Sequence, residues 1–68
     1  MERLDVTGYS CPEPVIRTEK LVKEGKKEFE VLVDTNVSKE NVARFLEEAG
    51  YTVTTSSEGS NYLVSAKK

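Results

Sequence analysis

Glu28-Phe29-Glu30-Val31-Leu32-Val33-Asp34 is the stretch of the sequence that decides the fold. Its side chains alternate so that Phe29, Val31 and Val33 share one side, and this period of two predicts a strand with that face buried. Patterns typical of helices lie before and after it. The stretch therefore predicts a strand between two helices.

The segment before this strand predicts a strand, a turn and a helix. Leu4 and Val6 alternate with polar neighbours, which indicates a short first strand, and Gly8 breaks that pattern. A helix then begins near Pro12 and Pro14, because proline suits a first turn whose N–H groups have no intrahelical partner. The helix is expected to end near Gly25. Its expected buried arc contains Pro14, Val15, Thr18, Leu21, Val22 and Gly25.

The segment after the strand carries the end signals of a second helix. Ser38 is the expected N-cap of this helix. Val37 and Val42 occupy the positions of a hydrophobic staple, which predicts a contact between them across the first turn. Gly50 suits the C-terminal exit.

The last part of the chain predicts two strands, over residues 51–55 and 61–66, joined through residues 56–60. The element order is therefore βαβαββ within a single domain of residues 1–68. Two successive right-handed crossovers place both helices on one face of the sheet. The expected fold class is a two-layer α/β sandwich with a four-stranded mixed sheet. Its open face should contact water, which suits Asp5, Glu28, Glu30, Thr52 and Thr54.

Composition excludes several classes of function. The net charge of −2, with basic residues in isolated pairs, argues against nucleic acid as the ligand. No apolar run approaches the roughly 20 residues that cross a bilayer, and the first residues do not form a secretion signal, so we expect a cytoplasmic protein without a membrane partner. With one cysteine and no histidine, neither a disulfide within the chain, nor a zinc site, nor a histidine base is available, and we expect no metal and no cofactor.

Cys11 is the candidate catalytic residue. It lies at or just before a helix N-terminus, whose dipole favours a thiolate or persulfide anion. A lone cysteine is often a small buried apolar residue, which is the competing interpretation. The turn that contains Cys11 favours exposure, because turns lie at the surface. In a parallel arrangement Cys11 and Asp34 share the sheet edge where α/β proteins usually place their sites.

Residues 8–15, Gly8-Tyr9-Ser10-Cys11-Pro12-Glu13-Pro14-Val15, resemble the Gly-x-x-Cys-Pro-x-Pro-hydrophobic signature of the TusA/SirA/YedF family of small sulfur carriers and sulfurtransferases. The similarity continues through Gly25, Val31, Val33-Asp34 and Gly50-Tyr51, and so covers essentially the whole chain.

The resemblance implies that Cys11 takes a sulfane sulfur from a protein donor such as a cysteine desulfurase, carries it as a persulfide and passes it to a protein acceptor, for example towards tRNA thiolation. It implies that Gly8, Pro12, Glu13 and Pro14 are the motif residues that position this cysteine. It also implies the strand order 1-2-4-3, with the last strand antiparallel between the second and the third.

One departure from the family pattern leaves the pathway open. After the second strand, TusA-like members commonly have an acidic pair followed by proline, whereas this chain has Asp34-Thr35-Asn36. That stretch is more similar to the first domain of YedF proteins linked to selenium metabolism. The alternatives are therefore a selenium-linked relay, in which a second domain usually follows, and a non-catalytic interaction or regulatory domain in which Cys11 is incidental.

Three residues near the motif are candidates for contacts with a partner protein. Ile16 falls off the buried arc of the helix and is the first candidate for an apolar contact. Arg17 can dock an acidic donor, although it also fits a solvated helix face. Asp34 can fix the rim or contact a partner, although an Asp at that position is more often a turn former. Tyr9 is expected to pack partly over the helix start.

Overall fold

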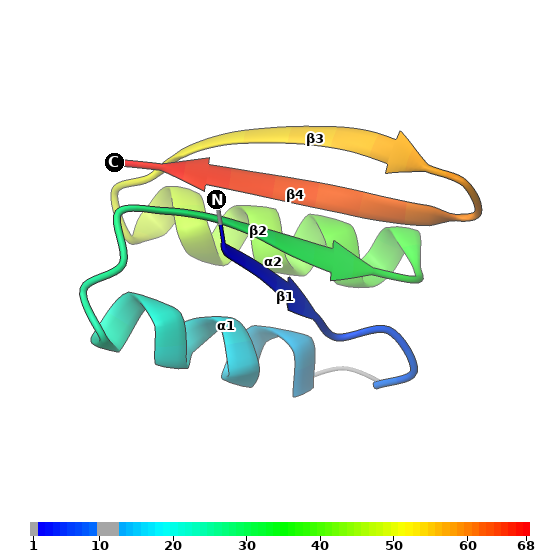
Figure 1. Ribbon diagram of the computed structural model, residues 1–68, viewed down its shortest axis with the longest axis horizontal. Coiled ribbons are helices and arrows are strands. Elements are labelled where there is room, and N and C mark those ends of the chain that lie inside the picture. Colours follow the sequence, from blue (N-terminus) through cyan, green and yellow to red (C-terminus); the bar gives the residue numbers. More distant parts are fainter. Residues whose placement is uncertain (1, 10–12) are drawn as a thin grey trace.

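A four-stranded sheet carries two helices on one of its faces in the computed structural model, which describes residues 2–9 and 13–68 (Figure 1). The predicted order βαβαββ and the two-layer α/β architecture are confirmed. The elements in chain order are β1 (Glu2–Asp5), α1 (Glu13–Lys23), β2 (Glu28–Val33), α2 (Asn36–Glu48), β3 (Thr52–Glu58) and β4 (Asn61–Lys67).

The strands lie in the order β1-β2-β4-β3, which is the order that the family resemblance implies. β1 and β2 are parallel, because the chain crosses over through α1 between them. β4 returns antiparallel to both β2 and β3, so it occupies a central position, and β1 and β3 form the two edges. The C-terminal ends of β1 and β2 consequently share one end of the sheet, where α1 and α2 also begin (Figure 1).

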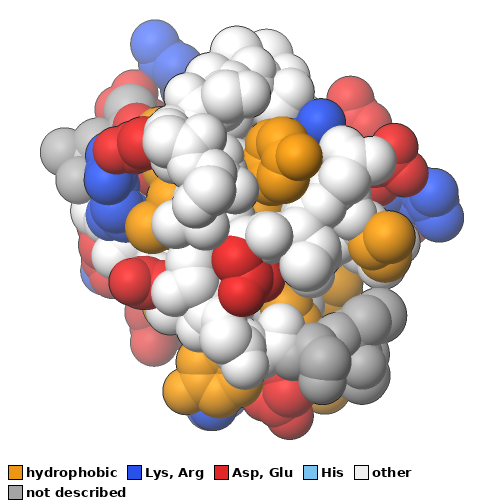
Figure 2. Space-filling model, turned by 90° about the vertical axis from the view of Figure 1, so that its right-hand side faces the viewer, with side chains coloured by type: hydrophobic (Ala, Val, Ile, Leu, Met, Phe, Trp, Pro, Cys, Tyr) orange, Lys and Arg blue, Asp and Glu red, His pale blue; other side chains and the backbone are white. Residues whose placement is uncertain are grey.

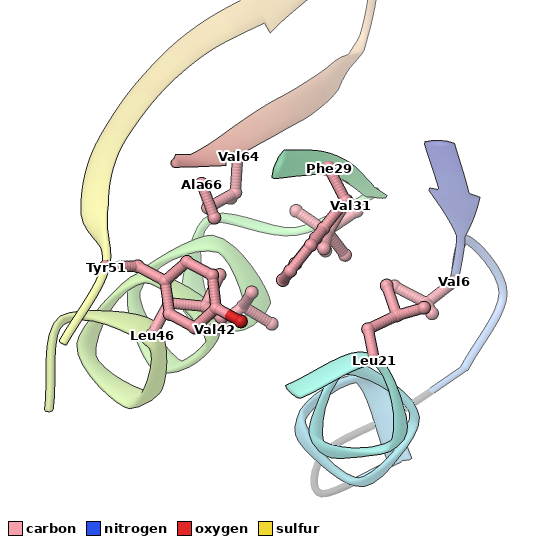
Figure 3. Close-up of a cluster of buried hydrophobic side chains, with 10 residues drawn as sticks. Val6, Leu21, Phe29, Val31, Val42, Leu46, Tyr51, Val64 and Ala66 are labelled. Carbon is pink, nitrogen blue, oxygen red and sulfur yellow. The ribbon is translucent and has the colours of Figure 1, made fainter. Parts of the chain in front are cut away.

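The core fills the space between the sheet and the helices (Figure 3). Phe29, Val31 and Val33 are fully buried, as the alternation in the quoted stretch predicts. The ring of Phe29 meets the ring of Tyr51 edge to face, with 5.4 Å between the centroids. Thr18 is the fully buried polar residue of α1, and its hydroxyl is satisfied by donating to the carbonyl of Pro14 at 2.8 Å.

The opposite face of the sheet is polar, as predicted. Asp5, Glu28, Thr52 and Thr54 are exposed there. Arg3 of β1 crosses this face and lies 3.3 Å from Glu30 and 3.2 Å from Glu58, and it thereby connects the β1 edge to the end of β3.

Each helix is followed, two residues after its last residue, by a glycine with positive φ, which is the exit that the sequence predicts. Gly25 has φ of 80°, and Gly50 has φ of 97°. After α2, the N–H groups of Gly50 and Tyr51 donate to the carbonyls of Glu47 and Leu46, so the last carbonyls of the helix are satisfied in a Schellman arrangement.

The predicted start of the second helix is wrong by three residues. Thr35, not Ser38, is the N-cap: its backbone is extended and its hydroxyl accepts from the N–H of Ser38 at 3.1 Å. The helix therefore begins at Asn36, and Ser38 is buried inside the first turn. Val37 is 61% exposed, so the predicted staple with Val42 does not form.

The third strand is longer than predicted. It runs from Thr52 to Glu58, because Ser56 and Ser57 pair with Leu63 and Tyr62 of β4 instead of forming a loop. The connection is reduced to Gly59 and Ser60. A positive φ of 64° at the first of two turn residues fits the type II′ hairpin turn.

Candidate functional site

The end of the molecule where β1 and β2 finish and α1 and α2 begin is the candidate site (Figures 1 and 2). We call it the motif rim and define it as residues 5–9, 13–17 and 34–38. Cys11 and Pro12 lie outside the described residues. Residues 5–9 before them and the start of α1 after them are described.

Gly8 begins the loop in a left-handed conformation. Its φ of 85° favours glycine, because a Cβ destabilises that region of the backbone. The N–H of Gly8 donates to Oδ2 of Asp34 at 2.8 Å, although the two residues are 26 positions apart in the sequence. This bond connects the loop after β1 to the end of β2. Of the alternatives considered for Asp34, the geometry therefore agrees with a residue that fixes the rim.

A second carboxylate accepts hydrogen bonds from the same loop. Asp5 accepts from the backbone N–H of Thr7 at 2.9 Å and from its hydroxyl at 2.6 Å. These bonds lower the pKa of Asp5 below its usual value, and the bond from the Thr7 hydroxyl has the largest effect. The turn that leads into the motif is thus held by two carboxylates, both of which accept hydrogen bonds from the backbone.

The start of α1 is anchored through Pro14. Its side chain is fully buried, and its carbonyl receives the Thr18 hydroxyl one turn later. Glu13, in contrast, is exposed at the first described position of the helix. Of these two motif residues, Pro14 is therefore buried and Glu13 is exposed to solvent.

Arg17 is not a freely solvated residue. Its guanidinium lies 4.0 Å from the centroid of the Tyr9 ring, and its Nε lies 3.4 Å from Oε2 of Glu13. The Nε atom is shielded from solvent and has no well-aligned hydrogen bond, so the contact with Glu13 is mainly Coulombic. Tyr9 packs over the helix start in the way the sequence analysis expects, and this stack joins the loop to α1.

Three large apolar side chains are exposed at the motif rim. Tyr9 is 40% exposed, Ile16 43% and Val37 61%. The exposure of Ile16 agrees with its place outside the buried arc. Sequence reasoning missed Val37, because it was assigned to a staple. Figure 2 views the molecule from this end and shows the apolar side chains as small separate patches among polar ones.

The described residues hold neither a metal centre nor a membrane-spanning helix. Among residues 2–9 and 13–68, no group of three or more His, Cys, Asp or Glu side chains is arranged to bind a metal ion. No helix in the same ranges is long and apolar enough to span a bilayer.

The fold and the rim define a small two-layer α/β domain in which Gly8 bonds to Asp34 at the end of β2 and Tyr9 stacks on Arg17 of α1. Comparison with known proteins gives this class its family. The model of the family described as sulfurtransferase TusA matches residues 2–68. The chain belongs to the TusA sulfurtransferase family.

Two relatives are similar to this chain over most of its length. A protein of Methanocaldococcus jannaschii named "Putative sulfur carrier protein" is 45% identical over 60 residues, which are 85% of this chain and 80% of the relative. The crystal structure of a SirA-like protein from Desulfitobacterium hafniense superposes with a TM-score of 0.83 at 31% identity, over 97% of this chain and 95% of the other.

Proposed function

We propose that the protein is a sulfur relay in which Cys11 carries one sulfane sulfur as a persulfide. In the first step the Cys11 thiolate attacks the outer sulfur of a donor persulfide, the S–S bond to Cys11 forms, and the donor thiolate leaves. In the second step an acceptor thiolate attacks the outer sulfur now on Cys11, and the Cys11 thiolate leaves. Sulfur is transferred without any net oxidant or reductant.

The observation that carries this proposal is the match of the whole chain to a sulfurtransferase family, with its only thiol inside the Cys-Pro-x-Pro motif. The geometry on both sides of the motif supports it. Gly8 is tied to Asp34, and Tyr9 is stacked on Arg17. These contacts join the loop after β1 to the end of β2 and to α1 next to the motif cysteine in the sequence, and transfer inside a partner complex then gains much of its rate from proximity.

The relay requires two protein partners, a sulfur donor such as a cysteine desulfurase and a protein acceptor. Because the sequence has no second cysteine, no thiol within the chain can discharge the persulfide, and the acceptor must drive release. Ile16 is the contact that we assign to a partner, since it is apolar, exposed and directly follows the motif in the sequence. We assign Arg17 and Asp34 to positioning the loop after β1, because Arg17 stacks on Tyr9 and Asp34 accepts from Gly8.

The test is intact-mass analysis after incubation with a cysteine desulfurase and free cysteine. The wild-type protein should gain the mass of one sulfur atom, and dithiothreitol should remove it. Cys11→Ser is the matched control and should gain nothing. Equal labelling of both proteins, or of neither across several desulfurases, contradicts the proposal.

Two further candidates are separated by measurements made beside the labelling. If the domain is a non-catalytic interaction module, binding to its partner is unchanged in Cys11→Ser and no labelling occurs. If the relay serves selenium metabolism, which the stretch Asp34-Thr35-Asn36 favours, the loaded protein should support selenium delivery and fail to restore tRNA thiolation in cells that lack their own carrier.

A further inference from the structure

The two edges of the sheet are protected to very different degrees. β1 is a four-residue edge strand with charged side chains at three positions, Glu2, Arg3 and Asp5. β3 is a seven-residue edge strand with one charge, Glu58, at its last position. Short length and charge are the usual protection of a sheet edge against pairing with another chain. β1 has both kinds of protection, and β3 has neither along most of its length.

The absence of charge along β3 is unusual for this sequence. Charged residues make up 32% of the chain, yet residues 49–57 contain none. A central strand such as β4 avoids charge because it is buried, but six of the seven residues of β3 are exposed. Burial therefore does not explain why β3 lacks charged residues before Glu58. The single charge, Glu58, is paired with Arg3 at 3.2 Å.

The hairpin geometry identifies the backbone groups that this edge presents. Glu58 and Asn61 flank a two-residue turn, and such flanking residues exchange both of their hydrogen bonds. Alternate residues of β3 then bond to β4. The residues between them, Val53, Thr55 and Ser57, direct their N–H and C=O groups outward, where the described structure gives them no strand neighbour.

We propose that the β3 edge is a self-association surface, on which a second copy of the chain pairs its own β3 antiparallel about a two-fold axis at Thr55. That register places Thr55 opposite Thr55 and Val53 opposite Ser57 of the other copy. The paired edges exchange about six backbone hydrogen bonds. Glu58 lies opposite Thr52, so no like charges meet, and hydroxyl-bearing residues that face each other are favourable cross-strand pairs.

A second copy fits this edge better than an unrelated segment, because the strand is complementary to itself in charge and in side-chain type. The shared edge is one strand long, smaller than the roughly 1,600 Å² of a standard interface, so the pairing is weak and reversible. β3 runs parallel to β2, so the two motif rims of such a dimer point in opposite directions. Pairing leaves both motif rims open, so the dimer does not depend on sulfur transfer.

The experiment is sedimentation equilibrium of the reduced full chain from about 10 μM to about 1 mM, the range in which weak pairs dissociate. Wild-type protein should show a monomer–dimer equilibrium. Thr55→Lys, which places two lysines face to face at the axis, should raise the dissociation constant at least about tenfold. Thr54→Lys is the matched control: it adds the same charge one residue away, opposite Ser56 of the other copy, and should change the constant less than about threefold.

Amide hydrogen exchange identifies the surface. The N–H groups of Val53, Thr55 and Ser57 should exchange more slowly at high protein concentration, while those of β1 should not change. A protein that stays monomeric throughout, or protection that appears at β1 or the motif rim, overturns the proposal. So does protection of β3 that appears only when an unrelated peptide is added.

Discussion

The backbone N–H of Gly8 donates to Oδ2 of Asp34 at 2.8 Å and so joins the loop after β1 to the end of β2. Gly8 lies three residues before Cys11 in the sequence, and Asp34 directly follows β2. The bond gives Asp34 a positional role that can be separated from its charge.

Replacing Asp34 tests that role. Asp34→Ala removes the acceptor and should speed exchange of the Gly8 amide and slow partner-dependent sulfur transfer several-fold. The stability loss should be about 1 kcal/mol, the usual net value of one hydrogen bond. Asp34→Asn keeps a carbonyl acceptor and should retain most of the transfer rate. If Asn and Ala variants are equally impaired in transfer, the charge of Asp34, rather than its bond to Gly8, is the important property.

Replacing Thr35 tests the start of α2. Its hydroxyl accepts from the N–H of Ser38, so Thr35→Ala should destabilise the protein by about 1 kcal/mol. Thr35→Ser retains the hydroxyl and should lose little. Urea denaturation curves of the three proteins give the comparison. A larger loss in Ser38→Ala than in Thr35→Ala would place the cap at Ser38 after all.

The interaction between Asp5 and Thr7 predicts a specific pH dependence. The two hydrogen bonds from Thr7 lower the pKa of Asp5, so the ionised carboxylate is stabilised in the folded protein. This contribution is present above the unfolded pKa of about 3.9 and is lost as the pH falls through the lower folded value. Thr7→Val removes the hydroxyl bond. NMR titration of the Asp5 side chain should show its pKa move upward in the variant, and an unchanged midpoint would contradict the assignment.

The sequence predicted those features that depend on a strong local pattern. Alternation at Phe29, Val31 and Val33 defined the buried face of β2, and Gly25 and Gly50 marked both helix exits, because only glycine adopts positive φ without strain. The start of α2 was misassigned because Thr35, Asn36 and Ser38 are all good caps, and the choice among them depends on backbone geometry that residue type does not encode.

Other features depend on contacts between segments that are distant in the sequence. The extension of β3 through Ser56 and Ser57 results from pairing with β4, which overrides the weak strand preference of serine. The stack of Arg17 on Tyr9 and the bond between Gly8 and Asp34 also join residues whose proximity follows from the folded chain. The positions of Cys11 and Pro12, outside the described residues, remain predictions of the sequence alone.

Ile16 gives a prediction about the partner surface. Ile16→Glu should slow transfer from a protein donor at least about fivefold, since one apolar contact is replaced by a charge, while alkylation of Cys11 by a small reagent changes little. Val37→Glu makes the same change on α2, at the other exposed apolar residue of the rim. Equal effects would indicate a contact surface that covers both helix starts, and a normal transfer rate in Ile16→Glu would exclude Ile16 from the interface.

The two motif prolines provide the last test, because they restrict the backbone around Cys11 without any reactive group of their own. Proline fixes φ near −65° and disfavours helical backbone in the preceding residue, so Pro12 constrains Cys11 and Pro14 constrains Glu13. Pro14 is also buried, so Pro14→Ala should cost about 1–3 kcal/mol through lost packing. Pro12→Ala and the double variant should both lose more sulfur transfer than their stability loss explains.

The chemical reactivity of the thiol should change in the opposite direction. Alanine restores N–H donors at the helix start, and these can lower the thiol pKa from its free value of about 8.5. Alkylation of Cys11 by a small reagent should therefore accelerate in Pro12→Ala/Pro14→Ala at neutral pH, while transfer from a protein donor slows. This divergence is expected only if the prolines position the sulfur for a partner. If both rates fell together in a protein that circular dichroism shows to be folded, the prolines would act on the intrinsic chemistry of the thiol, and their assignment as positioning residues would be wrong.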